Sequence, residues 1–154
     1  MIGIDDFKKN WAWVHRMTVD FVNVVPDDKW DFTPGRRLGP FSKQLRHVVW
    51  VRSVYNEALV AKKADFSRSG AHHTKSLARE VLVTALEAEQ RRLLEQLETF
   101  DTEATIDFSG TAFTFDNFAC EMIQHESIHH GQWSAYASLG GFATPQSWQA
   151  GWKL

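Results

Sequence analysis

The chain has 154 residues, which suits one domain with a buried core, and 44% of them are hydrophobic. Its net charge of −2 at pH 7 and its scattered pairs of basic residues argue against a nucleic-acid partner. The single cysteine, Cys120, excludes an intrachain disulfide, and no stretch approaches the roughly 18 apolar residues of a membrane span. We therefore expect one cytoplasmic domain over residues 1–154, with no nucleic-acid and no membrane partner.

Apolar residues at spacings of three and four predict a first helix from Ile4 to Val24, which Pro26 ends. The stretch that follows reaches to about residue 40 and is interrupted by proline and glycine. It contains Trp30 and predicts a long ordered loop, a kind of segment that is often functional.

A second helix is predicted from an N-cap at Ser42 to the pair Lys62-Lys63, and its apolar stripe includes His47. A third helix is predicted from about Thr74 to Thr99. Between residues 103 and 113 a weak alternation around Gly110 predicts a short hairpin-like loop.

A fourth helix is predicted from Thr114 or Asp116 to the pair Gly140-Gly141. Four such helices predict an all-α fold, a four-helix bundle. The inward stripe of the fourth helix is polar in its middle and comprises Phe118, Met122, His125, His129, Gln132, Tyr136 and Leu139.

His125 and His129 are four residues apart, so on a helix both imidazoles leave the same face. Burying them costs several kcal/mol unless each polar group finds a partner. They could hydrogen-bond to each other, to the backbone or to water. A pair at this spacing, with His47 on another inward stripe, favours a divalent transition metal, and imidazole does not choose among zinc, nickel, iron and copper.

Two other metal sites fit this segment poorly. The pattern His125-Glu126-x-x-His129 matches the zinc protease motif, but no Asp or Glu follows Glu126 and no third histidine stands at the required spacing. A di-iron carboxylate site needs two Glu-x-x-His pairs, and only one is present.

Two polar side chains flank the pair on the same side of the predicted helix. Glu121 could be a fourth ligand, a hydrogen-bond partner of an imidazole, a catalytic base or a solvated charge, and Gln132 could contact an imidazole or the substrate. We interpret Cys120 as a packed thiol that does not bind the metal. The other histidines are predicted to lie at the surface or in solvent, namely His15, His72, His73 and His130.

The order and spacing of His47, His125, His129 and Gln132 resemble the DinB-like superfamily, also called DinB/YfiT-like metalloenzymes. The loop with Trp30 and the Gly-Gly end of the last helix are similar too. The resemblance covers essentially the whole chain. It implies an up-down-down-up four-helix bundle in which His47, His125 and His129 hold the metal, and it implies a homodimer. Relatives often read His-His-Arg-Gly-Gln at the last ligand, whereas residues 129–132 here lack that arginine.

Characterised members of that superfamily are metal-dependent transferases or isomerases that use a low-molecular-weight thiol such as bacillithiol, mycothiol or glutathione. The expected function is therefore a thiol S-transferase acting on small electrophiles, in which the metal (Zn, Ni or Fe) lowers the thiol pKa. Glu121 or a metal-bound hydroxide would accept the proton. Two alternatives stay open: a non-catalytic protein that binds metal or small molecules in a stress response, and a metal-dependent hydrolase.

Overall fold

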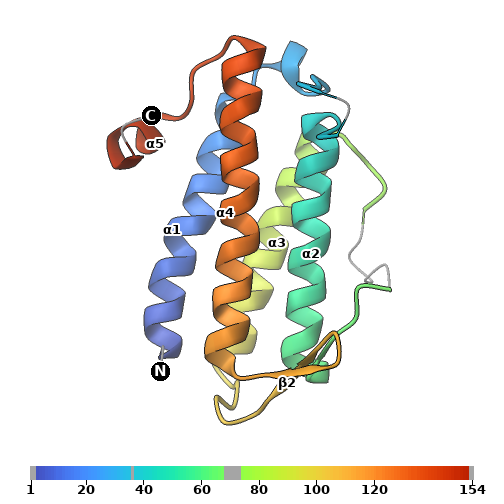
Figure 1. The fold of residues 1–154 in the computed structure, drawn as a ribbon, viewed down its shortest axis with the longest axis vertical. Coiled ribbons are helices and arrows are strands. Elements are labelled where there is room, and N and C mark those ends of the chain that lie inside the picture. The colour runs from blue at the N-terminus through green and yellow to red at the C-terminus, as the bar shows by residue number, and fades with distance from the viewer. Residues whose placement is uncertain (1–2, 36, 68–73, 153–154) are drawn as a thin grey trace.

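The computed structural model describes residues 3–35, 37–67 and 74–152, and in this part of the chain it is mostly helical. Four long helices lie side by side (Figure 1): α1 (Ile4–Val24), α2 (Phe41–Ala61), α3 (Arg79–Leu97) and α4 (Phe115–Gly140). The short elements are η1 (Asp27–Lys29), α5 (Gln146–Trp152), β1 (Lys63–Ala64), β2 (Ile106–Phe108) and β3 (Thr111–Phe113). None of the helices described is long and apolar enough to cross a membrane.

The ends of α4 agree with the sequence prediction. The hydroxyl of Thr114 accepts a hydrogen bond from the backbone N–H of Asn117 and caps the first turn. The helix stops where Gly141 adopts a φ of 75°, a left-handed conformation that glycine tolerates best.

Two helix starts differ from the prediction. The N-cap of α2 is Pro40 and not Ser42, because the Ser42 hydroxyl donates to Asp31 across the preceding loop at 2.5 Å. The third helix begins at Arg79 and not near Thr74. The indole N–H of Trp30 donates to the carbonyl of Leu77 at 2.7 Å, which holds the segment before α3 against the loop between α1 and α2.

A small sheet covers the end of the molecule where α2 finishes and α4 starts (Figure 1). β1 pairs with β2 in parallel, and β2 pairs with β3 antiparallel with Asp107 opposite Ala112. The predicted hairpin between residues 103 and 113 is therefore confirmed. Ser109 and Gly110 both have positive φ at its turn, which tightens the connection.

The buried apolar side chains form two clusters, one above the other along the helices. Phe7, Trp11 and Phe118 belong to the first, and Phe21 and Trp133 belong to the second. Polar and charged side chains are buried as well: Thr18, Ser42, Arg52, Ser53, Asn56, Glu89, Gln90, Glu126, His129 and His130. Several of these connect α1, α2 and α4 between the two clusters, at the level of the histidines.

The C-terminal tail packs on the helices through one tryptophan. Trp148 is buried and its indole N–H donates to the carbonyl of Met17 at 3.1 Å, whereas Trp152 is 59% exposed. Leu139, which the periodicity placed on the inward stripe, is 65% exposed. The buried residues near the end of α4 are Tyr136 and Ala137, and Leu139 lies about 200° around the helix from Ala137, on the opposite face.

Candidate metal centre

Three histidines from two helices converge midway along the molecule. The Nε2 of His125 lies 3.3 Å from the Nε2 of His47 on α2 and 3.2 Å from the Nε2 of His129 on α4. Their potential ligand atoms all lie within 4.8 Å of one another. A tetrahedral metal that binds two nitrogens at about 2.1 Å would hold them about 3.4 Å apart, so the observed spacing fits a shared metal ion.

The surroundings keep these imidazoles neutral, the form that binds a metal. Burial, with the neighbouring His129, lowers the pKa of His125 to about 4. Burial, with the neighbouring His47, lowers the pKa of His129 to about 4, and burial lowers the pKa of His47 as well. Because no carboxylate belongs to this cluster, a bound divalent ion would keep its full positive charge.

Gln44 orients His129, and sequence reasoning missed it. Its Oε1 lies 2.9 Å from the Nδ1 of His129, and because an amide oxygen can only accept, Nδ1 carries the proton and Nε2 is left for the metal. Gln44 is held in turn, since its Nε2 donates to the carbonyl of Leu38 at 2.5 Å. The signal in the sequence is the spacing of three residues between Gln44 and His47, which places both on one face of α2.

The loop before α2 is fixed at the same point. The hydroxyl of Tyr136 lies 3.0 Å from the carbonyl of Leu38 and 2.7 Å from the carbonyl of Gly39. Gly39 has a φ of 69°, which lets the chain turn there before it enters α2. The long loop predicted from the sequence therefore supports the ring of His129 through Leu38 and Gln44.

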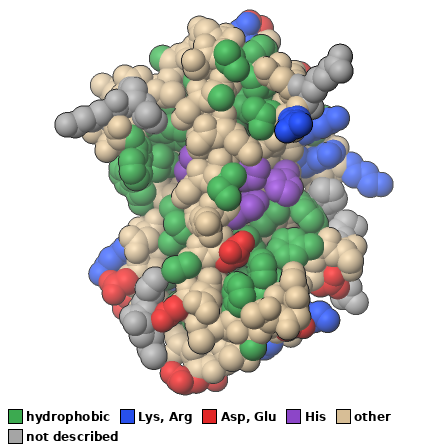
Figure 2. Space-filling model, viewed as in Figure 1, with side chains coloured by type: hydrophobic (Ala, Val, Ile, Leu, Met, Phe, Trp, Pro, Cys, Tyr) green, Lys and Arg blue, Asp and Glu red, His purple; other side chains and the backbone are tan. Residues whose placement is uncertain are grey.

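One side of the cluster faces solvent. His129 is buried, His125 is partly buried and His47 is exposed. Figure 2 shows the histidine side chains together at the surface midway along the molecule, with Lys and Arg side chains beside them. A ligand could reach a metal held here from this side, as a catalytic site requires.

The two predicted catalytic residues lie near the cluster but outside the set of converging ligand atoms. Glu121 is partly buried one turn before His125, and its charge helps to raise the pKa of Tyr55, whose ring packs edge-on against His125. Gln132 lies one turn after His129 and raises the pKa of that ring against the larger effect of burial. The buried Oε1 of Gln132 has no partner of good hydrogen-bond geometry in the described structure.

Behind the cluster, a charged pair is buried between α2 and α4. The Nε of Arg52 donates to Oε1 of Glu126 at 2.7 Å, and the side chains are 3% and 1% exposed. Burial would raise the pKa of Glu126, but Arg52 lowers it to about 2, so the carboxylate is ionised. The hydroxyl of Thr18 lies 2.7 Å from the other oxygen of Glu126 and 2.8 Å from the Nε2 of His130.

Three predictions about side chains outside the cluster were wrong. His130 is only 7% exposed, because it faces α1 and Thr18. His15 is not solvated: it is partly buried, and its Nδ1 accepts from Arg52 at 2.9 Å. Cys120 is exposed, because it lies on the outer side of α4. His72 and His73 lie outside the described residues.

The comparison with known families agrees with this arrangement. The sequence profile of the DinB superfamily matches residues 10–133, which include all three converging histidines and Gln132. None of the curated proteins matches the chain.

Proposed function

The chain belongs to the DinB superfamily, and from this premise we propose that it is a metal-dependent thiol S-transferase. His47, His125 and His129 would hold one divalent transition metal (Zn, Ni or Fe). We also propose that the four long helices form the superfamily's up-down-down-up bundle. The directions of the helices in Figure 1 support this, since α1 and α4 run one way and α2 and α3 the other.

The observation that carries the proposal is a set of three neutral imidazoles that is open on one side. The ligand nitrogens are at metal-site spacing and His47 faces solvent. A metal bound by neutral ligands supplies positive charge, which lowers the pKa of a thiol from about 8.5 and favours the thiolate at neutral pH.

The side chains around the site have separate roles in this proposal. Gln44 holds His129 in the tautomer that presents Nε2. Glu121 accepts the thiol proton, so that an O–H bond forms on its carboxylate as the S–H bond breaks. The sulfur then forms a bond to an electrophilic carbon of the substrate, and the leaving group departs with its electron pair. Gln132, whose amide acts on the ring of His129, would contact a donor group of the thiol or the substrate.

Positive charge beside the histidines supports an anionic thiol. Arg46 immediately precedes His47 on α2, and its guanidinium contacts the carbonyl of Lys75 at 3.5 Å. Figure 2 shows the Lys and Arg side chains next to the histidines. Arg46 and the neighbouring basic side chains would contact the carboxylates of a low-molecular-weight thiol. In many relatives, the arginine that this chain lacks between His130 and Gly131 would make that contact.

The test uses the cobalt-substituted protein, whose absorption spectrum reports the ligands of the metal. Glutathione, bacillithiol and mycothiol are added in turn, and consumption of 1-chloro-2,4-dinitrobenzene is followed with the thiol that changes the spectrum. Glu121→Gln should slow turnover and leave the metal content unchanged, because the amide keeps the size but cannot accept the proton. If Glu121→Gln instead removes the metal, Glu121 is a ligand. If no thiol changes the spectrum, the protein is better explained as a non-catalytic protein that binds metal or small molecules. Turnover of an ester by the metal-loaded protein would then test the remaining alternative, a hydrolase.

A further inference from the structure

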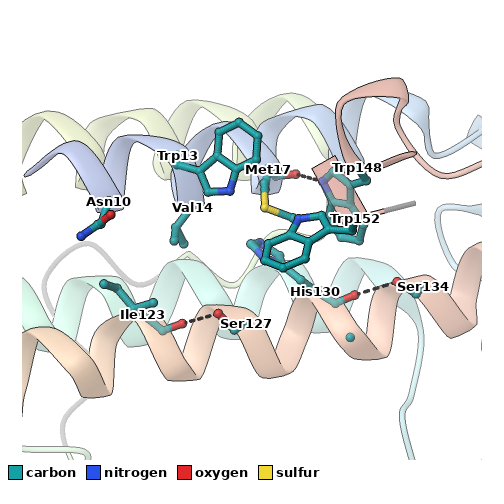
Figure 3. Close-up of a pocket in the computed structure, with 11 residues that line it drawn as sticks. Asn10, Trp13, Val14, Met17, Ile123, Ser127, His130, Ser134, Trp148 and Trp152 are labelled. Carbon is teal, nitrogen blue, oxygen red and sulfur yellow. Dashed lines mark hydrogen bonds between the residues drawn. The ribbon is translucent and has the colours of Figure 1, made fainter. Parts of the chain in front are cut away.

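A cavity lies on the other side of α4 from the three histidines, between α1, α4 and α5. It has a volume of about 820 Å³ and is open to solvent on one side, and none of the converging histidines lines it. This volume is in the range of sites that bind small organic molecules. Figure 3 shows three indoles around it, those of Trp13, Trp148 and Trp152, with the thioether of Met17 between them. Its wall is therefore mainly aromatic and apolar.

Three of the polar side chains in this wall already have a hydrogen-bond partner in the protein. The hydroxyl of Ser127 donates to the carbonyl of Ile123 at 2.8 Å, and that of Ser134 donates to the carbonyl of His130 at 3.3 Å. The indole N–H of Trp148 donates to Met17. Figure 3 shows these three bonds as dashed lines. The other buried polar group described in the wall is the ring of His130, and the roles of its two nitrogens as hydrogen-bond donor or acceptor follow from its neighbours.

The contacts of Thr18 fix the tautomer of His130. The ionised carboxylate of Glu126 and the carbonyl of Val14, 3.2 Å from the hydroxyl, can only accept, so the single hydrogen of the Thr18 hydroxyl points to one of these two groups. The hydroxyl oxygen must then accept from the Nε2–H of His130, 2.8 Å away. The ring is only 7% exposed, and the carboxylate of Glu126, 3.9 Å from Nε2, is already paired with Arg52, so the ring is neutral. A neutral ring protonated at Nε2 has an unprotonated Nδ1, and this nitrogen is the acceptor left for a molecule in the cavity.

We propose that this cavity binds a planar aromatic small molecule with one neutral hydroxyl or N–H donor, which bonds to Nδ1 of His130 while its ring packs among the tryptophans. Indole faces and the Met17 sulfur favour a flat aromatic ring. Among the described residues that line the cavity, none is an Asp, Glu, Lys or Arg that could pair with a charged ligand. Trp152, 59% exposed, stands at the mouth and would become covered when the ligand is bound.

Gly131 gives a way to fill the cavity without disturbing the helix. It lines the cavity, and a Cβ built on it meets no atom within 4 Å. The variant Gly131→Leu should therefore occupy the cavity and leave the metal content unchanged. Ser138→Leu, on an exposed position of the same helix outside the cavity wall, is the matched control.

The experiment is isothermal titration of the metal-loaded protein with 2-naphthol and with 2-methoxynaphthalene, which lacks the donor. We expect one 2-naphthol per chain, roughly tenfold weaker binding of the methoxy compound, loss of binding in Gly131→Leu and normal binding in Ser138→Leu. Equal affinity for both probes would overturn the role of His130. Unchanged binding to Gly131→Leu would place the probe elsewhere. Absence of binding in a dimeric protein, restored when Leu139→Lys makes it monomeric, would show instead that a second copy covers this face.

Discussion

The Nδ1 of His129 lies 2.9 Å from the Oε1 of Gln44, a contact that joins the metal-site face of α4 to the start of α2. It gives the ring one defined tautomer and one defined orientation. Through Gln44 the ring is also tied to the backbone of Leu38 in the preceding loop. The loop before α2 and the site are therefore one structural unit.

We predict that Gln44→Ala weakens metal binding by about 10- to 100-fold with little change in fold, because His129 loses the acceptor that presents its Nε2. Competition with a chromophoric chelator measures the affinity. Lys43→Ala, at the exposed neighbouring position, is the control and should bind metal normally. An unchanged affinity in Gln44→Ala would mean that the contact does not orient the ligand.

The buried pair of Arg52 and Glu126 should dominate the stability of the polar layer between the two apolar clusters. Glu126→Ala leaves the Arg52 charge buried without compensation and should lower the free energy of unfolding by about 3–5 kcal/mol. Urea denaturation of the metal-free protein measures this. Asp6→Ala, which removes an exposed ion pair with Lys9, should have little effect. The prediction fails if the two variants lose similar stability.

His15 should make the stability of the metal-free protein depend on pH. Burial, with the charge of Arg52, lowers its pKa from 6.5 to about 4. Between these values the unfolded chain binds more protons than the folded one, so stability is complete above pH 6.5 and is lost as the pH falls toward 4. The loss should reach about 3 kcal/mol. Between pH 4 and 6.5, the free energy of unfolding of His15→Gln should change less with pH than that of the wild type. An equal change in both proteins would mean that other groups cause the pH dependence.

The chain should form a homodimer at micromolar concentration. Besides the resemblance to the superfamily, two apolar side chains on one face of α4 support this expectation, because Ile128 and Leu139 are 55% and 65% exposed about three turns apart. Analytical ultracentrifugation should report a dimer that Leu139→Lys shifts toward monomer. Val60→Lys, at an exposed apolar position of α2, should not shift it. A monomer that persists at high concentration would contradict the prediction.

Helical periodicity and turn residues predicted the four long helices, the hairpin and the end of α4. The spacing of His125 and His129 also predicted a shared face, because that spacing depends only on helix geometry. The start of α3 could not be predicted, because Trp30 engages Leu77 from a distant part of the chain. The burial of Glu126 was equally hidden, since a helical glutamate reads as solvated until the fold supplies Arg52.

The central claim is that His47, His125 and His129 bind one metal ion together, and the metal content of the purified protein tests it most directly. Elemental analysis should find about one divalent transition metal per chain in the wild type and in His73→Ala, and little in the alanine variant of any of the three histidines. Loss of His47 is the decisive case, because it removes only the ligand from α2. Full occupancy in His47→Ala would contradict the account and leave a site formed by α4 alone.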